Sequence, residues 1–237
     1  MKVLIFDIFG DYGHFRKFYT TSSPLTFCFP PPPTIYGILG AILGIDKNEY
    51  LEKLNGTRIA VQIVKPVKKV RIGLNLINTK DNCWTLVSNK YHEPRTQILT
   101  EFIKEPYYRI FVSHTDDTIL SVLAENIKNH KTVYTISLGL SELISDFCFV
   151  SYCNVQEKKS SEYIELSTVV PFSLIQPNGI EVEAGKKYIK EKIPAEMKPG
   201  RIVSRYEDVL FDTYGQSLKV NLKNYWELEN GTKITFI

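Results

Sequence analysis

Three adjacent residues, Lys90, Tyr91 and His92, carry side chains that could serve general acid–base cleavage of RNA. In an extended chain, however, neighbouring side chains diverge, so three consecutive residues do not converge on one reacting atom. The sequence therefore favours anion binding by Lys90, His92 and Arg95 over catalysis at this position. The alternative hypothesis is a metal-independent endoribonuclease that uses His92 or His14 as general acid or base.

Positive charge is concentrated in one part of the chain, between residues 58 and 104. That segment holds nine basic residues against three acidic ones, a local charge of +6 in a chain whose total is only +3. A basic stretch in a near-neutral chain is compatible with polyanion binding, and the alternative is the solvated face of a hairpin. The side chains that we assign to polyanion binding in this segment are Lys68, Lys69, Arg71, Lys90, His92 and Arg95.

The same segment predicts a β-hairpin over residues 66–97. From Val67 to Ile77, apolar residues alternate with polar and basic ones, which is typical of a half-buried strand with one cationic face. Residues 79–82 supply turn chemistry, and residues 83–87 are expected to return as the partner strand.

Residues 10–21 are predicted to form a loop in which basic and aromatic side chains are interleaved. Arg16 and Lys17 would pair with phosphates, and aromatic rings would stack on bases, as in proteins that bind single-stranded nucleic acid. The aromatic residues named for this role are Tyr12, Phe15 and Tyr19.

A proline- and glycine-rich stretch, residues 22–44, organises the first half of the chain. Prolines 30–33 fix an extended backbone, after which Thr34 is expected to cap a helix. Glycines at positions 37, 40 and 44 weaken that helix, so we expect another backbone, a sheet or a phosphate chain, to approach Gly37 and Gly40 closely. Tyr36 is interpreted either as a base-stacking ring or as an ordinary half-buried one. The buried stripe of this helix is Ile35, Ile38, Leu39, Ile42 and Leu43.

Composition argues against several other classes of protein. The longest apolar run, residues 35–45, is too short to cross a bilayer. The N-terminus resembles a first strand more than a signal peptide. We therefore expect a cytoplasmic protein without membrane contact. Cys148 and Cys153 are five residues apart in a strand-like run and are expected on opposite faces, which argues against a shared metal. We expect neither a metal nor a cofactor.

The element pattern of residues 1–155 is strand, helix, strand, strand, helix, strand. This predicts an α+β, ferredoxin-like βαββαβ domain with the basic hairpin inserted in it. Thr115 is expected to cap the second helix, and residues 137–142 to form a turn followed by a short helix. Residues 156–237 are expected to form a small, mostly β packing or docking unit, with strands at 163–172, 179–182, 206–214 and 233–237.

Several stretches resemble the CRISPR-associated Cas five family. Ser22-Ser-Pro-Leu-Thr-Phe and Phe29-Pro-Pro-Pro-Pro-Thr-Ile-Tyr-Gly-Ile-Leu-Gly-Ala are similar to its N-terminal signature. Further matches resemble the type I-B flavour and keep their order along nearly the whole chain. They are Arg95-Thr-Gln-Ile-Leu-Thr-Glu-Phe-Ile-Lys-Glu-Pro-Tyr-Tyr-Arg-Ile, Tyr134-Thr-Ile-Ser-Leu-Gly-Leu-Ser-Glu, and residues 197–209.

The resemblance implies a protein of the RAMP superfamily, with a ferredoxin-like, RRM-type domain and an inserted β-hairpin thumb. It implies an antiviral role as a non-catalytic subunit of Cascade that holds the 5′ handle of the CRISPR RNA (crRNA). The implied partners are this RNA, the Cas seven backbone, the Cas eight large subunit and, indirectly, target DNA. A type I-C branch of the family trims the crRNA precursor, an activity that we do not carry over to this chain. A third hypothesis is a purely protein-binding subunit whose basic hairpin meets an acidic partner.

Taken together, the residues predicted to bind RNA are Arg16, Lys17, Tyr36, Gly37, Gly40, Lys68, Lys69, Arg71, Lys90, His92 and Arg95.

Overall fold

The computed structural model describes residues 1–79 and 93–237, and its central element is strand β1 (Lys2–Gly10). Six consecutive residues of β1, from Val3 to Ile8, are buried, because apolar layers cover both faces of the sheet around this strand. β1 pairs antiparallel with β6 on one side and with β7 on the other. The first strand expected at the N-terminus is therefore confirmed.

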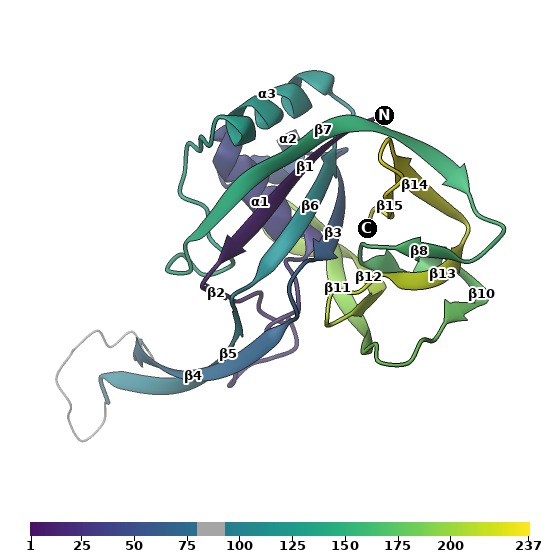
Figure 1. Cartoon of the computed structure of the whole chain (residues 1–237). Helices are drawn as coiled ribbons and strands as arrows, with labels where there is room; N and C mark the ends of the chain where they lie inside the picture. The colour runs from purple at the N-terminus through teal and green to yellow at the C-terminus, as the bar shows by residue number, and fades with distance from the viewer. Residues whose placement is uncertain (80–92) are drawn as a thin grey trace.

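In the described part of the chain, the main sheet has the antiparallel strand order β15-β14-β7-β1-β6-β3 (Figure 1). Helix α1 connects β1 to the β3 end of the sheet, and α3 connects β6 to β7. The mixed α and β content that the sequence predicted is confirmed. The bounds are α1 (Pro32–Leu43), α2 (Tyr50–Lys53), β3 (Arg58–Ile63), β6 (Tyr107–Ser113), α3 (Asp117–Lys128), β7 (Ser145–Lys159), β14 (Asn224–Leu228) and β15 (Lys233–Ile234).

Both long helices pack against the same face of this sheet, as Figure 1 shows. The predicted stripe of α1 is confirmed, because four of its five side chains are buried and the fifth, Leu43, packs against the same core. This cluster includes Leu4, Phe6, Ile8, Ile35, Ile38, Leu39, Ile42, Leu120, Leu123 and Ile127.

The two helices begin at other residues than those predicted. Thr34 does not cap α1, which starts at Pro32 with Pro31 at the N-cap and no side-chain hydrogen bond there. Proline is suited to the first helical positions because its missing N–H would lack an intrahelical partner anyway. Asp116, not Thr115, caps α3, and its carboxylate accepts a hydrogen bond of 2.7 Å from the backbone two residues on.

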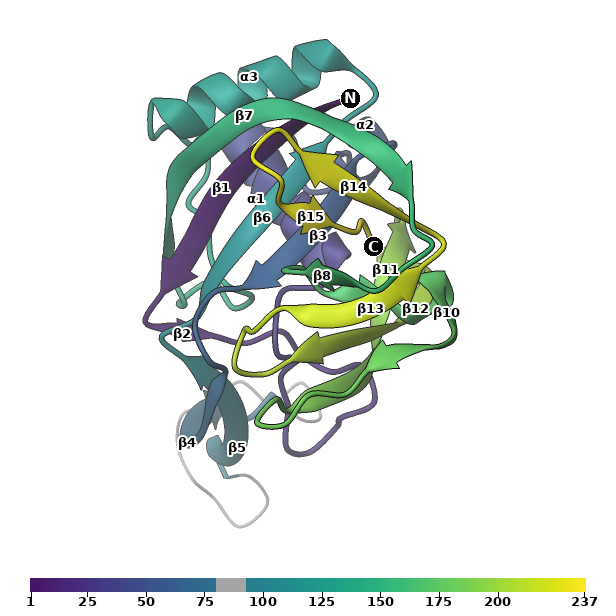
Figure 2. The same cartoon turned by 45° about the vertical axis from the view of Figure 1, so that its right-hand side comes forward.

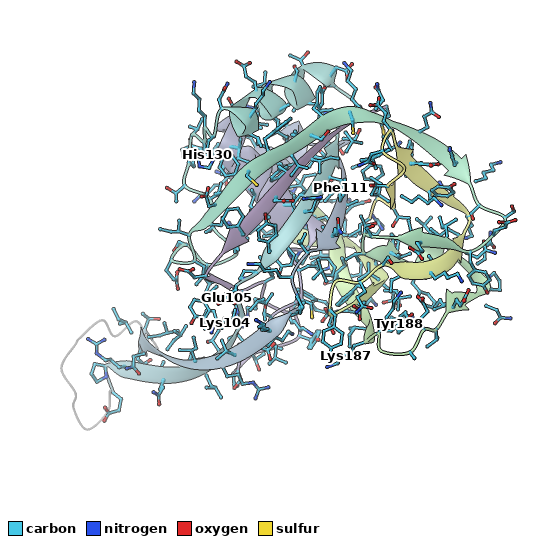
Figure 3. The ribbon with its side chains drawn as sticks, viewed as in Figure 1. Lys104, Glu105, Phe111, His130, Lys187 and Tyr188 are labelled. Atoms are coloured by element: carbon cyan, nitrogen blue, oxygen red, sulfur yellow. The ribbon has the colours of Figure 1, made fainter. Side chains whose placement is uncertain are left out.

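The strand pair β4–β5 projects from the body of the molecule, as both views show (Figures 1 and 2). Its base is next to the β5–β6 turn, where Lys104 and Glu105 are labelled in Figure 3. β4 is confirmed at residues 68–77, and it pairs along its whole length with β5. The predicted partner strand, residues 83–87, lies outside the described residues. The bounds are β2 (Tyr12–Gly13), β4 (Lys68–Ile77) and β5 (Arg95–Lys104), with sheet order β2-β5-β4.

β4 is less buried than predicted. Of its apolar side chains, Val70 and Leu74 are half-buried, whereas Ile72 and Leu76 are 36% and 44% exposed. The reason is that β4 and β5 extend beyond the core, so no second layer of described residues covers the outer part of the pair.

Residues 160–237 are mostly β, as predicted, and they share a core with the first part of the chain. Val169, Ile193 and Phe211 belong to the same buried cluster as the helix side chains. The proposed boundary at residue 155 falls inside β7, and the division into two units stays a prediction. The remaining strands form two small sheets (Figure 2). One consists of β8 (Ile164–Leu166), β10 (Ile175–Glu181) and β13 (Leu218–Leu222). The other consists of β9 (Val170–Pro171), β11 (Tyr188–Lys198) and β12 (Ile202–Asp212), next to a short 3-10 helix, η2 (Phe172–Leu174).

Two local expectations are wrong. Residues 137–142 lead into a turn closed by a bridge between Ser137 and Ile144, without the predicted short helix. Cys148 and Cys153 lie on the same face of the sheet, opposite Asp7 and Val3, because a bulge in the β1–β7 pairing inserts one extra residue between them. In the described residues, no cluster of histidine, cysteine or acidic side chains could hold a metal ion, and no helix there is long and apolar enough to span a membrane.

Candidate nucleic-acid interface

A cleft of about 630 Å³ lies where the β4–β5 pair meets the start of α1. It contains two of the residues predicted to bind RNA, Arg16 and Gly37, together with His14 of the alternative hypothesis. Six segments form its walls: the loop after β2, helix α1, the start of α2, the β4–β5 pair, the loop before β7 and the β11–β12 turn. Lining residues include Thr21, Pro24, Thr34, Leu74, Leu76, Ile98, Glu142 and Arg201.

Helix α1 presents one of its glycines to this cleft and buries another. A Cβ on Gly37 would have no atom within 4 Å, so the backbone here is open to a ligand. A Cβ on Gly40 would lie 2.9 Å from the Cβ of Tyr50, so this glycine accommodates a side chain of α2 and not the backbone expected from the sequence. Only Gly37 is thus placed to let a phosphate chain approach the helix.

The loop after β2 is held in place by its own hydrogen bonds. The backbone N–H of Phe15 donates to Thr26 Oγ1 at 2.9 Å, and Phe27 N–H donates to the Phe15 carbonyl at 2.8 Å. Arg16 donates to the Thr20 carbonyl at 3.0 Å while its side chain stays exposed on the cleft side. A fixed loop keeps the Arg16 guanidinium at the cleft before any ligand binds.

On the opposite wall, Gly139 allows the loop before β7 to touch His14. Its φ of +105° is in the region that favours glycine, and a Cβ there would lie 1.8 Å from the His14 carbonyl oxygen. The N–H of His14 donates to the Leu138 carbonyl at 2.9 Å. Gly139, which is within the family-like stretch 134–142 of the sequence, therefore closes this end of the cleft.

His14 itself is buried, and its ring lies against Phe102 with centroids 5.6 Å apart. Nδ1 is 2.6 Å from the carbonyl oxygen of Glu101. Burial lowers the pKa of His14, and the hydrogen bond to Glu101 only partly opposes this effect. The neutral ring therefore donates from Nδ1 and leaves Nε2 as an acceptor.

Two of the predicted cations are engaged in ion pairs within the protein. Lys17 is mostly buried and pairs with Glu191 of β11. Lys69 pairs with Glu101 at 3.0 Å and donates to the Thr26 carbonyl at 2.8 Å. Both ammonium groups thus link segments of the protein, which leaves them less available to phosphates.

The remaining cations of β4 are more exposed but lie away from the cleft. The Arg71 side chain is 60% exposed and 3.9 Å from Glu101, and Lys68 is 3.7 Å from Glu105. Because side chains alternate along a strand, Lys69 and Arg71 are on the opposite face of β4 from the cleft-lining leucines. The cationic face of the hairpin and the cleft are two separate surfaces.

Tyr36 is half-buried, and its hydroxyl donates to the Thr57 carbonyl at 2.9 Å. Burial raises the pKa of this phenol. These contacts favour the packing interpretation of Tyr36. Arg95 is exposed at the outer end of β5, whereas Lys90 and His92 lie outside the described residues.

Two residues that line the cleft, Arg201 and Glu142, were not among those predicted from the sequence. Arg201 is in the β11–β12 turn with a φ of +61°. No spacing in the sequence connects this turn with a loop almost two hundred residues earlier. The family-like stretch 197–209 is the only sequence signal that points to this turn.

Comparison with known proteins relates the chain to CRISPR-associated proteins. Residues 3–125 match a family model described as CRISPR-associated protein (Cas_Cas5). A CRISPR protein from Archaeoglobus fulgidus has a similar fold, with a TM-score of 0.60 at 15% identity over 99% of this chain and 98% of that one. A chain of a CRISPR RNA-guided surveillance complex aligns with a TM-score of 0.47 at 10% identity over 97% and 92% of the two chains. No match was found among curated protein sequences.

Proposed function

Because this chain belongs to the Cas five family of CRISPR-associated proteins, we propose that it is a non-catalytic subunit of a CRISPR effector complex. In this proposal it holds the 5′ handle of the crRNA in the cleft between α1 and the β4–β5 pair. The complex is a type I Cascade, of the I-B type suggested by the sequence motifs. The Cas seven backbone and the Cas eight large subunit are its neighbours, and target DNA is reached only through the complex.

The observation that carries this proposal is the convergence at the cleft of two exposed guanidinium groups and an open helix backbone. Arg16 and Arg201 line it from opposite ends of the chain, and Gly37 leaves room for close approach to α1. Arginine is suited to phosphate because its planar group donates two parallel hydrogen bonds. Flexible single-stranded RNA fits an open cleft of this kind better than a rigid duplex does.

The strand arrangement supports the finer assignment of fold. Strands β1, β3, β6 and β7 are connected by α1 and α3 and lie in the order β7-β1-β6-β3. This agrees with a ferredoxin-like βαββαβ unit. In this scheme the projecting β4–β5 pair is the thumb, and its exposed Arg71 and Arg95 continue the positive surface outward.

Measuring the affinity of the full chain for crRNA handle RNA at several salt concentrations tests the proposal. Arg16→Ala combined with Arg201→Ala should weaken binding and make the dependence of log K on log salt less steep, by about 0.7 for each phosphate that is no longer neutralised. The matched control is Lys2→Ala with Lys159→Ala, which removes the same charge from strand ends away from the cleft-lining residues. Equal weakening in both variants, or no binding by the unaltered chain, would contradict the proposal.

One observation favours a second function, metal-independent cleavage of RNA. His14 lies in the cleft wall with Nε2 free to accept a proton, as a general base requires. Incubation of the full chain with repeat RNA in EDTA distinguishes the two functions. A site-specific product that disappears with His14→Ala, while RNA binding persists, would establish the endoribonuclease, and absence of product supports the scaffold.

A further inference from the structure

We propose that single-stranded RNA leaving the cleft continues over an exposed aromatic cluster formed by Phe18, Tyr19 and Tyr206, where unpaired bases stack. This inference rests on the proposed function and adds a second contact region to it. The cluster combines the loop after β2 with β12, a strand of the C-terminal region in which no sequence pattern indicates RNA binding.

The three rings are all exposed to solvent. Phe18 is 50% exposed, Tyr19 is 58% exposed and Tyr206 is 40% exposed. Phe18 contacts both neighbours, with centroid distances of 4.8 Å to Tyr206 and 5.1 Å to Tyr19. Single exposed apolar residues are ordinary, but a contiguous exposed group contributed by distant segments is typical of a binding surface.

The ion pair between Lys17 and Glu191 fixes the loop that carries Phe18 and Tyr19. Lys17, directly before Phe18, points inward to Glu191 of β11. Its backbone N–H donates to the Leu25 carbonyl at 2.9 Å, and its carbonyl accepts from Thr20 Oγ1 at 2.8 Å. Lys17 therefore stabilises the loop and is not itself a contact to RNA, as the sequence had predicted it to be. The adjacent rings provide the contact surface. A surface fixed in advance loses little conformational entropy on binding.

The cations around the rings favour nucleic acid as the occupant. The exposed Lys192 places its ammonium 5.7 Å from the Tyr206 ring centroid. Arg16 is two residues before Phe18, and Arg201 precedes Tyr206 in the same β11–β12 hairpin, and both line the adjoining cleft. Stacking rings next to positive groups match the bases and phosphates of a single strand, without preference for sequence.

The test compares binding of short oligouridine with binding of abasic RNA of the same length, by fluorescence anisotropy on the full chain. Phe18→Ala with Tyr206→Ala should lower oligouridine affinity about five-fold or more, because each stacked base contributes on that scale. Binding of abasic RNA and the salt dependence of RNA binding should stay unchanged, since the rings carry no charge.

Phe18→Leu with Tyr206→Leu keeps apolar bulk without rings and should show the same loss of oligouridine affinity. Tyr214→Ala, at a ring 50% exposed beyond the end of β12, is the control and should bind as the unaltered chain does.

Two results would overturn the inference while the proposed function stands. One is unchanged oligouridine binding by both double variants, which would show that no base stacks on the cluster. The other is an equal loss for abasic RNA, which would mean that the rings only support the loop. If the unaltered chain binds neither RNA, the proposed function fails and the inference fails with it.

Discussion

The ion pair between Lys17 and Glu191 fixes the loop after β2 against β11, and both side chains are largely buried. Glu191→Gln should lower the free energy of unfolding by about 3–5 kcal/mol, because it leaves the Lys17 ammonium buried without its counter-charge. Lys17→Met with Glu191→Leu should recover most of this loss. Urea denaturation followed by circular dichroism measures both. Equal stability of Glu191→Gln and the unaltered chain would show that the pair is not buried in solution.

The same pair gives stability a dependence on alkaline pH. Burial lowers the pKa of Lys17, but the Glu191 carboxylate and the Tyr19 hydroxyl together outweigh this effect, so the pKa is raised above 10.5. A pKa raised in the folded state means that this contribution is full below the unfolded value and is lost as pH rises through the folded value. Stability should therefore fall above pH 10.5, less so in Lys17→Met with Glu191→Leu, as denaturation in alkaline buffers can show.

His14 gives stability the opposite dependence, on acidic pH. Burial lowers its pKa from 6.5, so the folded state resists protonation more than the unfolded state does. Stability from this residue is full above pH 6.5 and decreases as pH falls from there through the folded pKa. Compared with the unaltered chain, His14→Gln should lose less stability between about pH 7.5 and about pH 5. Parallel urea curves at the two pH values check this, and identical losses would contradict it.

At the scale of single residues, the sequence identified only part of the cleft lining, and it did not show which cations are paired within the protein. Arg16 and Gly37 do line it, but Lys17 and Lys69 hold segments together through Glu191 and Glu101. Charge alone does not distinguish a free lysine from a paired one. The distinction depends for Lys17 on a partner in a strand near the other end of the chain, and only the folded structure brings that partner near.

Among the elements, α1 offers a matched comparison between two of its glycines. Gly37→Ala should raise the free energy of unfolding by about 0.5–1 kcal/mol, because alanine favours the helix and the new methyl meets nothing within 4 Å. Gly40→Ala should lower it, by about 1–3 kcal/mol, because its methyl would lie 2.9 Å from Tyr50 Cβ. Chemical denaturation of both variants measures these changes. The same sign at both positions would contradict the packing described for α1 and α2.

Strong periodicity made elements predictable, and weak periodicity did not. The apolar stripe of α1 and the alternation in β4 predicted the element and its approximate bounds. β11 was missed because its sequence, rich in lysine and glutamate and interrupted by Pro194, has little intrinsic preference for a strand. Its pairing with β12 along its whole length determines its conformation instead. The bulge that aligns Cys148 with Cys153 also has no signal in local sequence.

For the whole molecule, the mixed α and β content followed from the sequence, whereas several strands of the second half and the cleft did not. Each of its walls is an ordinary loop, helix or strand pair when taken alone, and only the fold brings them together. The C-terminal region illustrates the same point. It was expected to pack or dock, yet it contributes Arg201 to the cleft and Tyr206 to the aromatic cluster.

The shared core makes a prediction about how the chain unfolds. Phe211 of β12 packs edge to face on Phe29, just before α1, with centroids 5.3 Å apart. Phe211→Ala should lower the free energy of unfolding by about 3–5 kcal/mol and reduce hydrogen-exchange protection in α1 as much as in β12. Phe172→Ala, at a ring 38% exposed, should leave both nearly unchanged. Mass spectrometry of exchanged peptides compares the two regions.

A loss of protection confined to residues 156–237 would instead mean that the chain unfolds as two units divided at residue 155. Because Val169, Ile193 and Phe211 lie in one cluster with the helix side chains, we expect a single cooperative transition.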